Sequence, residues 1–157
     1  MADVFISYKR EEKHLAQRLH DALEQFGFSV WFDVDLLSGD EFRPVIKEMI
    51  DKCSAVVVLW SPLSVSSQFV IDEAGYAQRN DKLCPAMLEP CELPFGFGGA
   101  HADSLEGWDG QLRHDGFNRF LGSIERKTGK EARLGSSTPE TARQRAEITA
   151  FQAAAKL

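Results

Sequence analysis

The chain has 157 residues, of which 43% are hydrophobic and 27% charged, a composition that fits one globular domain with a core of its own. Its net charge of -6 argues against a nucleic-acid partner, because that binding draws its affinity from clustered lysine and arginine. The three cysteines form no Cys-x-x-Cys pair and the four histidines have no metal-ligand spacing, so neither a disulfide framework nor a metal site is predicted.

The first third of the chain alternates between strand and helix patterns. Residues 3–7 are an apolar strand, and from Glu11 a helical stripe follows that Gly27 should end. Residues 28–32 are a second strand, followed by a polar loop over 33–40. A second helix should then turn four apolar side chains inward, namely Phe42, Ile46, Met49 and Ile50.

Residues 55–60 (AVVVLW) read as a strand buried on both faces, which places it at the centre of a parallel sheet. A serine-rich turn follows, and then a helix that should pack Val70, Ala74 and Ala77 on the sheet. Phe69 and Glu73 are four residues apart and share a neighbouring face. The pattern therefore predicts a carboxylate beside an aromatic ring at the carboxyl end of a central strand, where open α/β sheets bind their ligands.

The remaining elements complete one domain. Residues 83–88 are a fourth strand, placed near the sheet edge by Pro85, residues 104–108 a short edge strand, and 111–127 a last helix. The fold class predicted is α/β, a flavodoxin-like, doubly wound, five-stranded parallel sheet flanked by helices. Domain 1–127 should be followed by a flexible linker over 128–137. A helix over 138–157 should lead to a further domain or dock on a partner, the alternative being a helix packed on its own domain.

Five segments carry a further pattern in their sequence order. They are DVFISYKR at 3–10, GFSVWFD at 27–33, the loop 34–42, the serine-rich run leading to Phe69 and Glu73, and LPFGF at 93–97 with Leu105, Gly107 and Trp108. Together they resemble Toll/interleukin-1 receptor (TIR) domains, and specifically the NAD-consuming branch of bacterial antiphage systems, over about residues 2–127. Two residues depart from the family pattern: Phe69 stands where the family usually has Trp, and Glu12 where an Asp is common.

The resemblance implies that Glu73 is the catalytic residue of an NAD+ glycohydrolase. Lys9 and Arg10 are expected at the carboxyl end of the first strand, where they suit the pyrophosphate or ribose, or are a solvated loop pair. Ser67 is expected to contact ribose or to cap the helix. Phe69 and Trp108 would either stack on nicotinamide or pack in the core. The resemblance adds Tyr8 and Asp33 as substrate contacts, and assigns pocket gating and contacts between subunits to a loop that contains Leu36, Leu37, Gly39 and Phe42.

Three functions compete at this level. The first is an NAD+ glycohydrolase or cyclase with no cofactor beyond its substrate, acting as a cytoplasmic immune effector that self-associates and works with a fused or partner sensor domain. The second is a non-enzymatic TIR adaptor that signals by homotypic assembly. The third, a flavodoxin or response regulator, is disfavoured because no phosphate loop follows the first strand and no phosphoacceptor Asp follows Trp60. No secretory leader or long apolar run is visible, so no membrane partner is expected.

Overall fold

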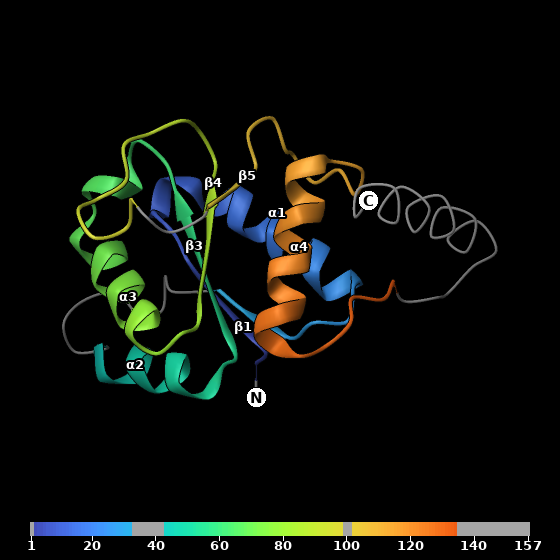
Figure 1. Ribbon diagram of the computed structural model, residues 1–157, viewed down its shortest axis with the longest axis horizontal. Coiled ribbons are helices and arrows are strands. Elements are labelled where there is room, and N and C mark those ends of the chain that lie inside the picture. The colour runs from blue at the N-terminus through green and yellow to red at the C-terminus, as the bar shows by residue number, and fades with distance from the viewer. Residues whose placement is uncertain (1, 33–42, 99–101, 135–157) are drawn as a thin grey trace.

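One parallel sheet organises the protein in the order β2-β1-β3-β4-β5 (Figure 1). The computed structural model describes residues 2–32, 43–98 and 102–134. The strands are β1 (Val4–Ser7), β2 (Val30–Trp31), β3 (Ala55–Trp60), β4 (Leu83–Met87) and β5 (Asp103–Ser104). The predicted flavodoxin-like sheet is therefore confirmed, with β3 at its centre and its carboxyl end beside that of β1.

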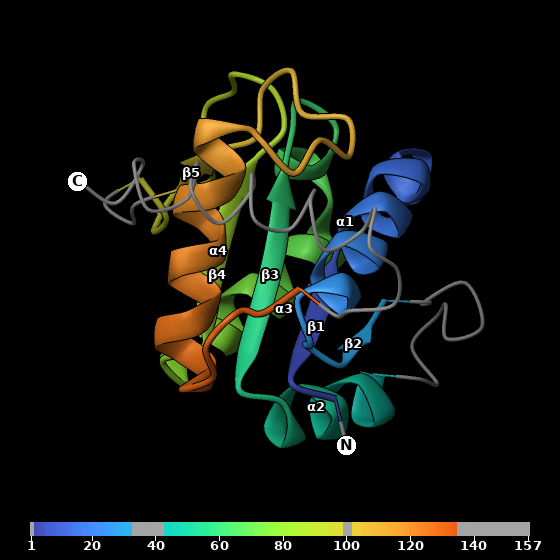
Figure 2. The same cartoon turned by 90° about the vertical axis from the view of Figure 1, so that its right-hand side faces the viewer.

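Helices cover both faces of this sheet. On one face lie α1 (Lys13–Gln25) and α4 (Asp115–Thr128), and on the other lie α2 (Arg43–Lys52) and α3 (Gln68–Arg79). Figure 2 looks onto the face that carries α1 and α4, with β3 visible between the two helices. A 3₁₀ turn, η1 (Arg10–Glu12), joins β1 to α1, and a second, η4 (Ser64–Ser66), lies between β3 and α3.

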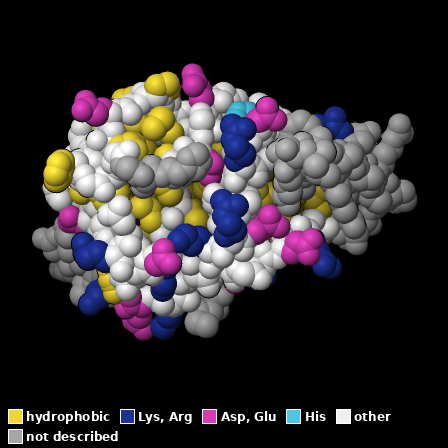
Figure 3. All heavy atoms as spheres, viewed as in Figure 1, with side chains coloured by type: hydrophobic (Ala, Val, Ile, Leu, Met, Phe, Trp, Pro, Cys, Tyr) yellow, Lys and Arg dark blue, Asp and Glu magenta, His cyan; other side chains and the backbone are white. Residues whose placement is uncertain are grey.

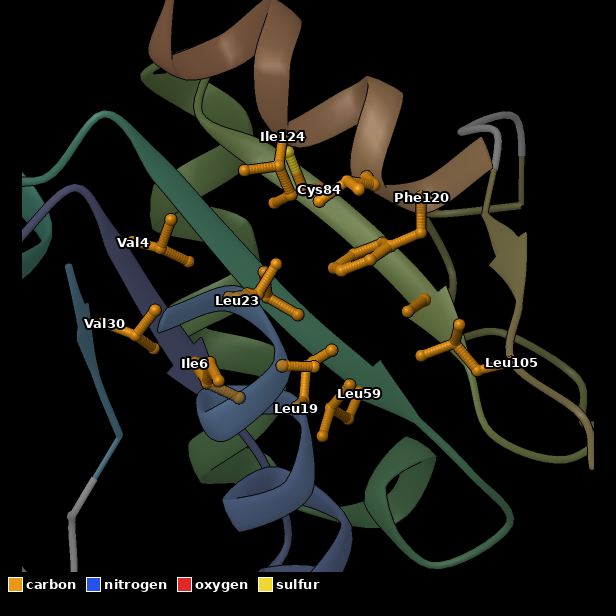
Figure 4. Packing of buried hydrophobic residues seen from close by; sticks show 14 of the residues in the cluster. Val4, Ile6, Leu19, Leu23, Val30, Leu59, Cys84, Leu105, Phe120 and Ile124 are labelled. Carbon is orange, nitrogen blue, oxygen red and sulfur yellow. The ribbon is translucent and has the colours of Figure 1, made fainter. Parts of the chain in front are cut away.

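The alternation of side chains along β3 builds two separate core clusters. All six residues of β3 are buried, with Val57 and Leu59 facing α1 and α4. Val56, Val58 and Trp60 face α2 and α3. Figure 4 shows the first cluster, in which side chains of α1 and α4 meet those of the strands. A strand packed on both faces in this way must be apolar at every position, which is the pattern of residues 55–60.

Two cysteines belong to these clusters. Cys53 lies on the α2 and α3 side, and Cys84 faces α4 (Figure 4). Burial raises the pKa of the Cys53 thiol to about 11 and that of the Cys84 thiol to about 12. Both thiols are therefore protonated near neutral pH and act as small core residues.

The last elements differ from the prediction in their boundaries. The final helix begins at Asp115 rather than at 111, because the His114 imidazole caps it by accepting a 3.0 Å hydrogen bond from the Phe117 N–H. The edge strand β5 has only two residues instead of the expected five, since the chain turns at Gly107 with φ +77°. Pro85 lies in β4, one strand from the edge, and precedes the two residues that pair with β5.

Residues 129–134, part of the segment 128–137 that the sequence predicts to be a linker, contact the domain at several points. Lys130 Nζ lies 2.8 Å from the Asp3 carboxylate and 3.0 Å from the Gly27 carbonyl oxygen. The Arg133 N–H donates to the Phe26 carbonyl oxygen at 2.9 Å. Ala132 and Leu134 also pack on the core cluster beside α1 and α4. The segment therefore ties the end of α4 to the amino ends of β1 and β2, and the predicted helix 138–157 lies outside the described residues.

Within the described ranges, no helix is both long enough and apolar enough to span a membrane.

Candidate active site

Two buried side chains meet where β1 and α3 come together. Ser7 is the last residue of β1, and its hydroxyl donates a 2.6 Å hydrogen bond to Oε1 of Glu73. Ser7 is fully buried and Glu73 is only 6% exposed. Strand alternation explains the contact, because Phe5 and Ser7 point to the face that α3 covers. A carboxylate is thus held nearly dry at the carboxyl end of a central strand.

The turn before α3 sets the position of this carboxylate. The Ser64 hydroxyl donates to the Leu59 carbonyl oxygen at 2.8 Å and accepts from the Ser61 N–H at 2.8 Å. Ser67 then caps α3 by accepting from the Val70 N–H at 3.4 Å, which matches the capping alternative, while a ribose contact stays a prediction. From this start, α3 buries Val70 against the sheet as predicted and carries Glu73 one turn later.

A second buried carboxylate lies close to the same turn. Glu12, at the end of η1, is 7% exposed and accepts a 2.7 Å hydrogen bond from the Ser61 hydroxyl. Desolvation by burial raises the pKa of Glu12, and the nearby carboxylates of Glu89 and Glu11 raise it further. The hydrogen bond from Ser61 and the charge of His14 oppose this rise. Glu12 therefore pays a desolvation cost that its serine partner only partly offsets.

Three other predicted residues lie on the segments that carry Ser7 and Glu73. Lys9 and Arg10 follow β1 directly, with the Lys9 ammonium 3.9 Å from Glu11 and its side chain 38% exposed. Phe69 is partly buried against the cluster under α3, one turn before Glu73. The carboxyl ends of β1 and β3 lie side by side, so the segments that carry these residues leave the sheet at the same edge. That the two cations and the aromatic ring converge on Glu73 stays a prediction.

Two other residues that the sequence predicts as substrate contacts, Tyr8 and Trp108, lie on the other face of the sheet. Tyr8 is 3% exposed and belongs to the cluster beside α1, where its ring lies 6.2 Å from that of Phe32. Trp108 stacks on Phe117 with ring centroids 5.3 Å apart, and its Nε1–H donates to the Gln111 carbonyl oxygen at 2.8 Å. Both aromatic side chains belong to the core cluster on the opposite face from Glu73, so the expectation that they line its site is not supported by their positions. For Trp108, the structure matches the alternative of core packing.

Comparison with known protein families identifies the family of this chain. A family model described as TIR domain matches residues 4–121. The chain belongs to the TIR domain family. The match covers all the strands and every described helix except the end of α4.

Solved structures of other TIR proteins share the fold. The TIR domain of the Toll-related receptor TRR-2 from Hydra magnipapillata has a TM-score of 0.66 and 20% identity, covering 80% of this chain and 99% of that one. A metazoan TIR-STING receptor from C. gigas has a TM-score of 0.60 and 23% identity, covering 84% of this chain and 41% of that one. No curated protein matches the sequence. At such identities the likeness extends to the fold of the TIR domain and no further.

The loop residues assigned by resemblance, Asp33, Leu36, Leu37, Gly39 and Phe42, lie outside the residues that the structure describes. Conversely, the TIR domain contains three polar residues to which the sequence assigns no role, namely Ser7, Glu12 and Ser61. Ser7 could have been found, since a serine closing an otherwise apolar, fully buried strand must have a hydrogen-bonding partner. The pairing of Glu12 with Ser61 joins residues 49 positions apart and leaves no local signal.

Proposed function

We propose that this TIR domain is an NAD+ glycohydrolase with Glu73 as its catalytic residue. The observation that carries the proposal is the buried Glu73 carboxylate held by Ser7 at the carboxyl end of β1. A helix surface usually keeps glutamate in solvent, and burying a carboxylate is costly unless it gains partners. Retaining it at the ligand-binding edge of the sheet is what a catalytic role would require.

One carboxylate is sufficient for this chemistry. Nicotinamide leaves NAD+ as a neutral pyridine that takes the electron pair of the C–N bond, so no acid must protonate it. The ribose becomes an oxocarbenium-like cation until water, or another nucleophile, adds to the anomeric carbon. Glu73 would stabilise that cation and hold the ribose hydroxyls, which are electrostatic and positioning roles. Water gives ADP-ribose, whereas attack by an atom of the same molecule gives a cyclic isomer.

The neighbouring side chains suit the rest of the substrate. Lys9 and Arg10 would bind the pyrophosphate or a ribose, since both cations follow β1, the strand whose Ser7 hydroxyl donates to Glu73. Phe69 would offer a flat apolar face to the nicotinamide ring, without the indole N–H that a Trp would bring. We include Asp33 as a substrate contact by resemblance alone. No metal or cofactor is needed for any of these steps.

We further propose that the enzyme is the effector of a bacterial antiphage or cell-death system and becomes active on self-assembly. Two apolar side chains in the segments that follow β3 and β4 are open to solvent: Leu63 is 52% exposed and Phe95 is fully exposed. Figure 3 shows apolar side chains gathered over the region where Figure 1 places the β3–α3 turn and the loop after β4. Such a surface suits contact with another copy of the TIR domain, to which Leu36, Leu37, Gly39 and Phe42 would add. A fused or separate sensor domain would supply the trigger.

The competing function is a non-enzymatic adaptor that signals through TIR assembly. The two are separated by incubating the purified protein with NAD+ at high protein concentration and measuring nicotinamide by chromatography. We expect release by the wild-type protein and a loss of about 100-fold or more in Glu73→Gln. Glutamine keeps the shape of the side chain and an acceptor for Ser7, so circular dichroism should show an unchanged fold. Comparable release by the folded variant would reject Glu73, and no release by the wild type at any concentration would favour the adaptor.

A further inference from the structure

Most of the buried polar side chains gather at one junction. Seven polar or charged residues are buried among the described residues, and the exceptions to the gathering are Asp103 and Asn118. The other five come from the ends of β1 and β3 and the segments that follow them, namely Ser7, Glu12, Ser61, Ser64 and Glu73. Burying a polar group costs free energy, so five such groups at one junction lower the stability of the fold there. A precise arrangement of these side chains is a reason to keep them buried.

Two serine–glutamate hydrogen bonds connect the two strand ends, one donated from the β1 side and one from the β3 side. Ser7 of β1 donates to Glu73 of α3, the helix that follows β3. Ser61, just after β3, donates to Glu12 of η1, the turn that follows β1. Each strand end is thus bonded to the segment that continues from the other strand. Glu12 accepts its hydrogen bond from Ser61, so any influence of this bond on Glu73 passes through the turn that Ser61 begins.

The hydroxyl of Ser61 has one proton to donate, and Glu12 accepts it. Its oxygen is then left to accept from two backbone groups, the Leu63 N–H at 3.2 Å and the Ser64 N–H at 3.1 Å. These two bonds shape the turn that leads through η4 into the cap of α3. Without Glu12, the Ser61 hydroxyl would turn its proton toward another acceptor, such as the Ser64 hydroxyl oxygen 3.4 Å away. The lone pairs of the Ser61 oxygen would then point in new directions, which would weaken the two hydrogen bonds that it accepts from the backbone N–H groups.

A change in this turn would reach Glu73 because the path is short and rigid. Ser64 fixes the turn to β3 through the Leu59 carbonyl oxygen, and Ser67 caps α3 immediately afterwards. Glu73 lies in the second turn of that helix, where a shift of its first turn moves the carboxylate relative to Ser7. Displacements of about 1 Å at a reacting group can cost about 100-fold in rate.

We propose that Glu12 is a positioning residue for Glu73, acting through the Ser61 hydroxyl and the turn that starts α3. The consequence for catalysis rests on the proposed function of Glu73, whereas the consequence for the turn does not. Glu12 contacts neither the ribose nor the reacting atoms in this assignment. Its contribution is the hydrogen-bond acceptor, so a neutral side chain of the same shape should replace it.

The experiment compares Glu12→Ala, Glu12→Gln and a matched control, Glu11→Ala, whose side chain is exposed on the same 3₁₀ turn. Hydrogen exchange of the amides in residues 61–70 reports the turn directly, and nicotinamide release from NAD+ gives kcat and KM. Glu12→Ala should speed exchange in this segment by about ten-fold or more and lower kcat by about ten- to 100-fold, with KM changed less. Glu12→Gln and Glu11→Ala should stay within about two-fold of the wild type in both measurements, because an acceptor for Ser61 remains in each.

The two measurements keep the proposal separate from the proposed function. Unchanged exchange in folded Glu12→Ala would overturn the positioning role whatever the enzyme does. Faster exchange with unchanged kcat would also overturn it, since the turn would then not control Glu73. Equal damage by Glu12→Gln would show that charge rather than hydrogen bonding matters. If wild-type protein released no nicotinamide, the proposed function would fail, and the exchange pattern would still decide whether Glu12 orders the turn.

Discussion

Ser7 and Glu73 are 66 residues apart in the chain, yet the serine hydroxyl lies 2.6 Å from the glutamate carboxylate in a site from which water is almost excluded. The hydrogen bond fixes one oxygen of Glu73 to the carboxyl end of β1, the strand beside the central one. A hydrogen bond to a charged group contributes about 1.5–3 kcal/mol, more than a bond between neutral groups. Ser7 should therefore matter to activity although it is too buried to be a substrate contact.

We expect Ser7→Ala to lower kcat for nicotinamide release by about ten-fold, because the Glu73 carboxylate loses the donor that orients it. The control is Ser66→Ala, which removes a hydroxyl from an exposed serine of η4. Steady-state kinetics with NAD+ measure both variants against the wild type. Equal activity of Ser7→Ala and Ser66→Ala would show that the bond is structural only.

The pH dependence of stability should reveal the buried Glu12. Its folded-state pKa is raised by burial above the unfolded value of about 4.3, so the folded state favours the protonated acid. The wild type therefore loses stability relative to Glu12→Gln as pH rises from about 4 through the folded pKa, and this pH-dependent loss is absent below about pH 4. Urea unfolding at pH 4 and pH 7 measures this. A difference between the two proteins that is equal at both pH values would contradict the raised pKa.

Two glycines of α4 make a matched pair for stability. A Cβ on Gly116 would overlap the carbonyl oxygen of Ser104 in β5, so Gly116→Ala must push the helix from the sheet edge. Gly122 has only the mobile end of Arg126 nearby, at 3.6 Å. We expect Gly116→Ala to destabilise by about 2 kcal/mol or more, and Gly122→Ala to be neutral or stabilising by up to about 1 kcal/mol. Thermal melts of both variants decide, and similar midpoints would refute the close approach.

Two truncations test where the domain ends. Removing residues 135–157 should leave the melting midpoint unchanged, whereas removing residues 129–157 should lower it by several degrees. The second deletion loses the contacts of Lys130 and Arg133 with Asp3, Gly27 and Phe26. A domain of this size shifts by about 4 °C for each kcal/mol lost. A large loss from the shorter deletion would show that the last 23 residues also belong to the core.

Self-assembly should make activity depend on concentration. Specific activity is expected to rise with protein concentration, and Leu37→Asp or Phe95→Ser should suppress the rise while leaving the melting midpoint unchanged. Phe95 is fully exposed, so its replacement removes apolar surface without opening the core. Enzyme assays across a wide dilution series, with light scattering in parallel, provide the measurement. Turnover that is flat down to very dilute protein would argue against assembly.

Elements with a clear hydrophobic period could be predicted from the sequence, and contacts between distant segments could not. The run 55–60 indicates a doubly buried strand, and the positions of Val70, Ala74 and Ala77 indicate the buried face of a helix. The position of Trp108 was beyond reach, because a loop has no period that tells which side of the sheet its ring will join. Tyr8 was within reach, since it alternates with Ser7 and must face away from it.

The two buried serine–glutamate bonds also constrain when the site can form. They join segments 66 and 49 residues apart, so neither carboxylate meets its partner until β1, β3 and the start of α3 have come together. Contacts between such distant segments are made late, after the entropy of closing long loops has been overcome. During synthesis, a nascent chain that ends before α3 holds Ser7 without its carboxylate. Only a chain that has brought β1, β3 and α3 together has the Ser7–Glu73 hydrogen bond in place. If Glu73 is catalytic as proposed, partly made chains would therefore not cleave NAD+.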